Sequence, residues 1–81
     1  MLFTQLITLK KKVDAYNKQI DRNPAVFHNP HMFSDGHWAV AIIFGYVPEG
    51  RAMADILEYT NVCCPYSFFG VVNGKITLFV Q

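Results

Sequence analysis

The sequence SFFGVVNGKITLFVQ, residues Ser67 to Gln81, predicts the two strands around which the rest of the chain is organised. Two apolar runs flank Asn73-Gly74, and this dipeptide between strand-like segments is the strongest short-range signal of a β-hairpin. A type I′ turn needs positive φ at both central residues, which Gly adopts freely and Asn tolerates. The turn predicts a register that pairs Val72 with Lys75, Val71 with Ile76, Phe69 with Leu78, and Phe68 with Phe79. An isolated hairpin is marginal in water, so the rest of the chain must supply its packing partners.

The composition predicts one small domain, residues 1–81, with surplus apolar surface. The 81-residue chain is 52% hydrophobic and 16% charged, whereas soluble domains are about 25% charged. We therefore expect apolar surface that the chain itself leaves uncovered, and with it a protein partner or a homodimer. The formal net charge of +1 creates no long-range field that would attract nucleic acid or an anionic membrane.

The N-terminal segment has the periodicity of an amphipathic helix, which we place at residues 2–22. Its apolar residues recur at intervals of 4, 3, 4, 3 and 4, which puts them on one stripe of an α-helix: Leu2, Leu6, Leu9, Val13, Tyr16 and Ile20. Asn23-Pro24 ends the helix, because the residue before proline is disfavoured in the α region.

The remaining chain divides into a loop, a strand, a second helix and the hairpin. Residues 24–37 contain two prolines and three histidines and predict a loop. Residues 38–47 are apolar on both faces and predict a central strand, and residues 48–60 predict a helix opened by Pro48-Glu49-Gly50. With the hairpin at 67–81 the order is α-β-α-β-β, a two-layer α+β sandwich with a small three-stranded sheet.

The second half of the chain resembles a known fold. Helix Arg51–Thr60, followed by a short loop and then Phe69-Gly70-Val71-Val72-Asn73-Gly74-Lys75-Ile76, is similar to the second half of ubiquitin-like β-grasp domains of the sulfur-carrier and TGS type. The resemblance covers about 30 residues. That family begins with a hairpin where this chain has a long helix, and Phe79-Val80-Gln81 does not match the di-glycine of sulfur carriers. The resemblance implies a fold analogy and no function.

Three histidines in the 24–37 loop are candidate metal ligands. His28, His31 and His37 follow an H-x2-H-x5-H pattern with Asp35 between them. Zinc needs three or four such side chains converging on one point, and this spacing matches no established zinc template. We therefore expect ordinary loop histidines and no cofactor, with a metal site as the alternative.

The adjacent cysteines Cys63 and Cys64 are candidate nucleophiles if a loop histidine lies beside them. They follow a helix C-terminus, whose partial negative charge raises the pKa of a thiol, so small buried side chains are the favoured interpretation. Two adjacent cysteines form no disulfide framework, and no stretch has the length or the flanking charges of a transmembrane helix or signal peptide. We expect a cytoplasmic protein.

The first helix carries a basic side that could contact nucleic acid. Its cations are Lys10, Lys11, Lys12, Lys18 and Arg22. Aromatic residues on a sheet can stack with bases, yet the hairpin adds only Lys75. A solvated helix face explains this cluster, and nucleic-acid binding is kept as a further alternative.

The predicted sheet suggests where a partner would bind. If both helices cover the face with Ala39, Ala41 and Ile43, an aromatic face is left open, and such clusters are enriched at interfaces. The candidate partner-binding residues are Trp38, Val40, Ile42, Phe44, Tyr46, Phe68 and Phe79. We therefore expect a non-enzymatic interaction module, an inhibitor or adaptor with the size of small phage or mobile-element inhibitors, that uses this face or a free sheet edge. The alternative is a small metal- or thiol-dependent enzyme built on His28, His31, His37, Cys63 and Cys64.

Overall fold

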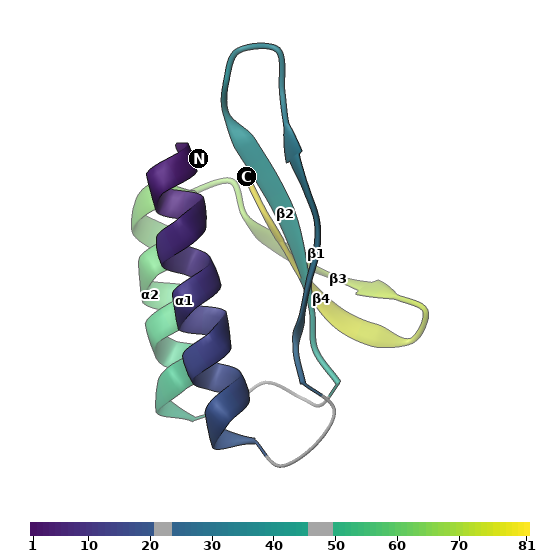
Figure 1. Cartoon of the computed structure of the whole chain (residues 1–81). Coiled ribbons are helices and arrows are strands. Elements are labelled where there is room, and N and C mark those ends of the chain that lie inside the picture. The colour runs from purple at the N-terminus through teal and green to yellow at the C-terminus, as the bar shows by residue number, and fades with distance from the viewer. Residues whose placement is uncertain (21–23, 46–49) are drawn as a thin grey trace.

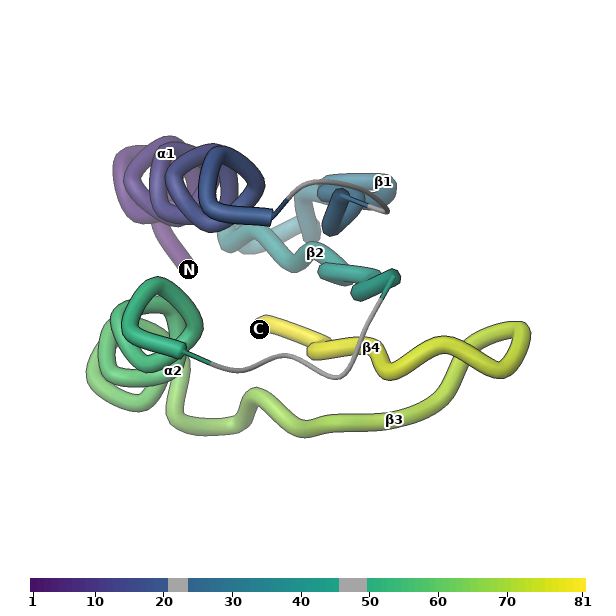
Figure 2. The backbone as a smooth tube through the Cα atoms, turned by 90° about the horizontal axis from the view of Figure 1, so that it is seen from below, coloured from purple at the N-terminus to yellow at the C-terminus, as the bar shows by residue number. Residues whose placement is uncertain are grey.

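A computed structural model describes residues 1–20, 24–45 and 50–81 (Figure 1). In chain order its elements are α1 (Phe3–Gln19), β1 (Val26–Met32), β2 (Trp38–Ile43), α2 (Arg51–Cys63), β3 (Phe68–Val72) and β4 (Lys75–Val80). The four strands form one sheet in the order β1-β2-β4-β3, with antiparallel neighbours throughout. Both helices lie side by side on one face of this sheet (Figure 2). The predicted two-layer α+β class is confirmed, with four strands in place of three.

The C-terminal hairpin has the predicted register. Phe68 pairs with Phe79, Val71 with Ile76, and Val72 with Lys75. The two turn residues have positive φ, 51° at Asn73 and 77° at Gly74, as a type I′ turn requires. Local turn chemistry was sufficient to specify these two strands.

The extra strand, β1, lies within the segment that we predicted to be a loop. β1 pairs with β2 through Val26 to Ile43 and His28 to Ala41, with a register shift between His28 and His31. Asn29 sits at this irregularity with a φ of 52°. A strand that contains a proline and a residue in the left-handed region is tolerated only at a sheet edge or a bulge, and β1 has both features. The proline and the turn-type residues that predicted a loop therefore belong to an irregular edge strand.

The helices differ from their predicted bounds mainly at their ends. α1 ends at Gln19, and α2 begins after Gly50 and continues to Cys63, past the predicted end at residue 60. Residues 46–49, which include the predicted helix start at Pro48, lie outside the described residues. No helix within the described ranges is both long enough and apolar enough to span a bilayer.

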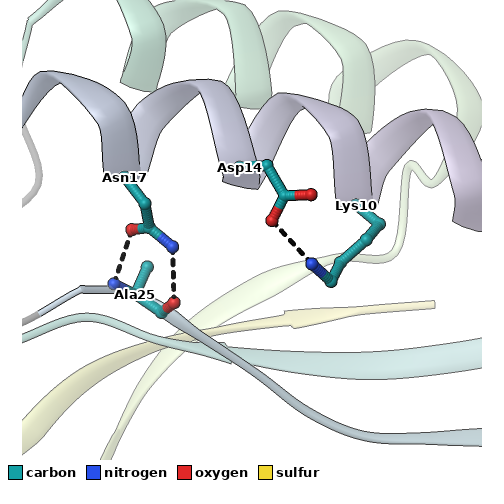
Figure 3. Close-up of polar contacts among 4 residues, drawn as sticks. All are labelled: Lys10, Asp14, Asn17 and Ala25. Atoms are coloured by element: carbon teal, nitrogen blue, oxygen red, sulfur yellow. Dashed lines mark hydrogen bonds and ion pairs between the residues drawn. The ribbon is translucent and has the colours of Figure 1, made fainter.

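Polar contacts fix α1 against the sheet at both of its ends. At the start, Met1 and Trp38 exchange backbone hydrogen bonds of 2.8 and 2.7 Å. Near the end, the Asn17 side-chain amide donates to the Ala25 carbonyl at 2.9 Å and accepts from the Ala25 N–H at 2.8 Å (Figure 3). Because Ala25 directly precedes β1, Asn17 connects the helix layer to the edge of the sheet.

The core lies between the helices and the face of β2 that we had expected to be open. Val40, Ile42 and Phe44 are at most 5% exposed, and the Phe44 ring packs edge-on against Tyr16 at 5.5 Å between ring centres. Both helices and β4 also contribute to the core, together with residues that flank the elements: Leu6, Leu9, Val13, Ala52, Met53, Ile56, Leu78 and Val80, with Met1, Ala25 and Cys64. The predicted face assignment of this strand was therefore wrong. Large side chains must fill the space between the layers at close-packed density, and alanines in their place would leave voids.

Candidate partner-binding surface

The sheet face turned away from the helices is called the outer face. Directly opposed residues of neighbouring antiparallel strands share a face, so the register of the sheet defines a row across all four strands: His28, Ala41, Phe79 and Phe68. Within the described residues no helix or strand covers this row (Figure 2). Thr77 also belongs to the outer face, but its side chain is buried, and its hydroxyl donates to the Lys75 carbonyl at 3.2 Å.

An aromatic pair dominates one half of the outer face. The rings of Phe68 and Phe79 stack with centres 5.1 Å apart and planes inclined by 21°. Gly70 makes room for this arrangement, since a Cβ at that position would lie 2.9 Å from Cε2 of Phe79. The glycine thus allows the Phe79 ring to lie over β3 and to meet Phe68 across the strand pair.

A groove of about 350 Å³ runs beside the aromatic pair. It is lined by His28, Asn29, His31, Phe33, Ala39, Val40, Ala41, Phe68, Phe79, Val80 and Gln81. Ala39 and Ala41 form the floor of the groove because their short side chains lie between the larger side chains of β1 and β4. The centre of the groove is apolar, and exposed histidines stand along its β1 side.

The structure separates the seven predicted binding residues into groups. Phe68 and Phe79 lie on the outer face as expected. Trp38 lies on the helix side, half-buried, with its ring 5.6 Å from that of Phe3. Val40, Ile42 and Phe44 form core, as described above, and Tyr46 lies outside the described residues.

Sequence reasoning missed the alanines and the β1 histidines as parts of this surface. The alternation of small residues at Ala39 and Ala41 was a signal in the sequence that this face points away from the core, because small side chains cannot fill a core on that side. The sequence-based prediction instead places both helices against that face. The histidines could not be placed while their segment was read as a loop.

The histidine cluster does not converge on one point. His28, His31 and His37 are all exposed; the His31 ring contacts Phe33 at 5.0 Å, and His37 pairs with Asp35 in the β1–β2 turn. Among the described residues no three His, Cys, Asp or Glu side chains are placed to share a metal ion. The backbone N–H of His37 donates to Asp35 at 3.0 Å, and this bond, together with the bond to the His37 side chain, lowers the pKa of the Asp35 carboxyl. The Asp35 carboxylate therefore stabilises the β1–β2 turn.

The two cysteines lie at the end of α2. Their Sγ atoms are 3.0 Å apart, Cys64 is buried, and burial, followed by the contact with Cys63, raises the pKa of the Cys64 thiol to about 12. The Cys64 carbonyl accepts from both the backbone N–H and the hydroxyl of Ser67. A neutral buried thiol is a poor nucleophile, so Cys64 is poorly suited to a thiol mechanism.

The basic side of α1 is partly occupied by contacts within the chain. Lys10 pairs with Asp14 at 2.6 Å (Figure 3), and the Lys12 ammonium lies 5.3 Å from the centre of the Tyr59 ring. Arg22 lies outside the described residues. These lysines are on the helix layer, opposite the aromatic outer face, so no surface combines them with the stacked rings.

Comparison of the chain with protein-family models, with curated proteins and with solved structures found no match.

Proposed function

We propose that this protein is a non-enzymatic interaction module that acts as an inhibitor or adaptor by binding a partner protein with its outer face. The observation that carries the proposal is the stacked pair Phe68 and Phe79 beside the groove. Protein interfaces concentrate their affinity in aromatic anchors surrounded by a more polar rim. The outer face has such an aromatic anchor, the phenylalanine pair, and exposed polar residues, His28 and His31, on the opposite side of the groove.

Two further features support binding over catalysis. The described side chains form no three-ligand metal cluster, and the one buried thiol keeps its proton. The cytoplasmic location belongs to the same proposal, because two adjacent cysteines provide no disulfide framework of the kind that small secreted domains use.

The proposal is tested by site-specific photo-crosslinking in the native host. A benzoylphenylalanine replacing His28 places the reactive group at the groove, and the same residue replacing Val62, which is exposed on α2, is the matched control. A protein captured only from position 28 is then purified and titrated with the wild type. Phe68→Ser and Phe79→Ser should weaken binding about tenfold or more, whereas Val62→Ser should not.

The comparison of variants decides the outcome. Circular dichroism first shows that each variant is folded. A partner that binds the two phenylalanine variants as tightly as the wild type, or that crosslinks equally from position 62, would contradict an outer-face site.

A further inference from the structure

The β3 edge, Phe68–Val72, carries backbone groups that are not used in the sheet. A hairpin closed by a two-residue turn makes its first hydrogen-bonded pair at the residues next to the turn, here Val72 and Lys75. The alternation then directs the N–H and C=O of Gly70 and Phe68 towards β4. Those of Phe69 and Val71 point away from the sheet, because β3 is its last strand.

The two edges of the sheet are protected very differently. Edge strands are usually blunted by proline, bulges or charge. β1 has Pro30, a register shift and a residue at positive φ. The β3 edge has none of these, and its sequence FFGVV contains no charged residue. Its side chains are also exposed, 53% at Phe68, 49% at Phe69 and 70% at Val71.

We propose that the β3 edge binds the β3 edge of a second copy of this chain, antiparallel, with the twofold axis at Gly70. In this register the outward-facing Phe69 meets Val71 of the other copy, so each of the two equivalent pairs exchanges two backbone hydrogen bonds. Shifting the register by two residues loses one of these pairs. In the proposed register, with the axis at Gly70, each Phe69 and each Phe68 lies opposite a valine, and aromatic and β-branched residues are favourable cross-strand pairs.

The lack of charge permits this contact, and its small area keeps it weak. Because Phe68–Val72 carries no charge, two identical edges meet without repulsion. A fully buried phenylalanine covers about 150–250 Å², so the exposed parts of these side chains offer on the order of 300 Å² per copy. The total lies below the roughly 1,200 Å² of stable complexes. An interface of this size is weak and reversible, so the dimer should form only at high protein concentration.

The contact goes beyond the proposed function and does not depend on it. The dimer would join two four-stranded sheets into one and place both outer faces on the same side. A partner protein could still bind the groove of a monomer, because most of the groove lies over β1, β2 and β4. Its far end extends to Phe68, which the dimer also uses.

Sedimentation velocity over a range of about 1 µM to 1 mM tests the dimer. The wild type should shift from monomer to dimer within this range. Val71→Pro removes one outward N–H without touching the bonds to β4, and Val71→Lys adds a charge at the same edge; each should raise the Kd about tenfold or more. Val62→Lys, an exposed valine on α2, is the control and should dimerise like the wild type.

Mixing variants tests the register. Phe69→Lys and Val71→Glu should each dimerise poorly alone, and an equimolar mixture should dimerise better because the two new charges are opposed across the axis. A wild type that stays monomeric at about 1 mM, or a Val71→Pro variant that dimerises as well as the wild type, overturns the contact. A mixture that gains nothing overturns the twofold at Gly70.

Discussion

Cys64 shows how a single residue makes stability depend on pH. Its folded pKa of about 12 lies above the ordinary thiol value of 9.0 chiefly because the thiol is buried. Below about pH 9 both states hold the proton, so its contribution is fully present. As the pH rises from about 9 to about 12 the unfolded chain releases the proton and the folded chain does not, so the free energy of unfolding falls.

Urea unfolding at about pH 7 and about pH 10.5 measures this effect. The wild type should lose more stability between the two conditions than Cys64→Ala, which has no thiol to titrate at this position. Cys63→Ala leaves the buried thiol in place and removes only its contact with Cys63, the lesser cause of the raised pKa, so this variant should keep most of the wild type's loss. Equal losses in the wild type and Cys64→Ala would contradict the assignment.

At the level of elements, the hairpin depends on the left-handed conformation of Gly74. Its φ is 77°, and a Cβ there would meet no atom within 4 Å, so the cost of Gly74→Ala is purely conformational. We expect a loss of about 1–2 kcal/mol in the free energy of unfolding. Asn73→Gly keeps positive φ accessible and should change stability by only a few tenths of a kcal/mol. An alanine variant as stable as the wild type would show that the turn is not type I′.

The same hairpin shows how far sequence reasoning reaches. Its register follows from two turn residues and their neighbours, so it could be predicted in full. β1 could not, because Pro30 and the histidines are typical of loops and only pairing with β2 makes that segment a strand. The edge position that tolerates these residues is a property of the assembled sheet.

At the level of the whole molecule, the face of β2 that enters the core depends on its pairing with β4. Both faces of the strand are apolar, so the sequence alone leaves two choices, and a choice of the wrong one exchanges core and surface. The pairing of Ile42 with Leu78 decides it. Of the candidate site, Phe68 and Phe79 could be placed because the hairpin register reaches them, whereas the groove floor at Ala39 and Ala41 could not.

The connection between the two layers rests partly on Asn17, which the helical pattern alone assigns to the polar surface of α1. Its amide satisfies both the N–H and the C=O of buried Ala25 (Figure 3). Asn17→Ala would leave both backbone groups without these partners and should cost about 1–3 kcal/mol in the free energy of unfolding, although alanine is the better helix former. Lys18→Ala, at the next and exposed position, should be nearly neutral.

Chemical denaturation measures the loss, and amide hydrogen exchange shows where it acts. If Asn17 holds the helix layer to the sheet edge, Asn17→Ala should speed exchange in β1 more than in the β3–β4 hairpin, because the hairpin closes through its own turn. Asn17→Asp keeps an acceptor for the Ala25 N–H but presents a carboxylate to the Ala25 carbonyl, so it should also destabilise the fold. Uniform exchange across all four strands would instead mean that Asn17 stabilises the molecule only as a whole, and that β1 is held by its ladder with β2.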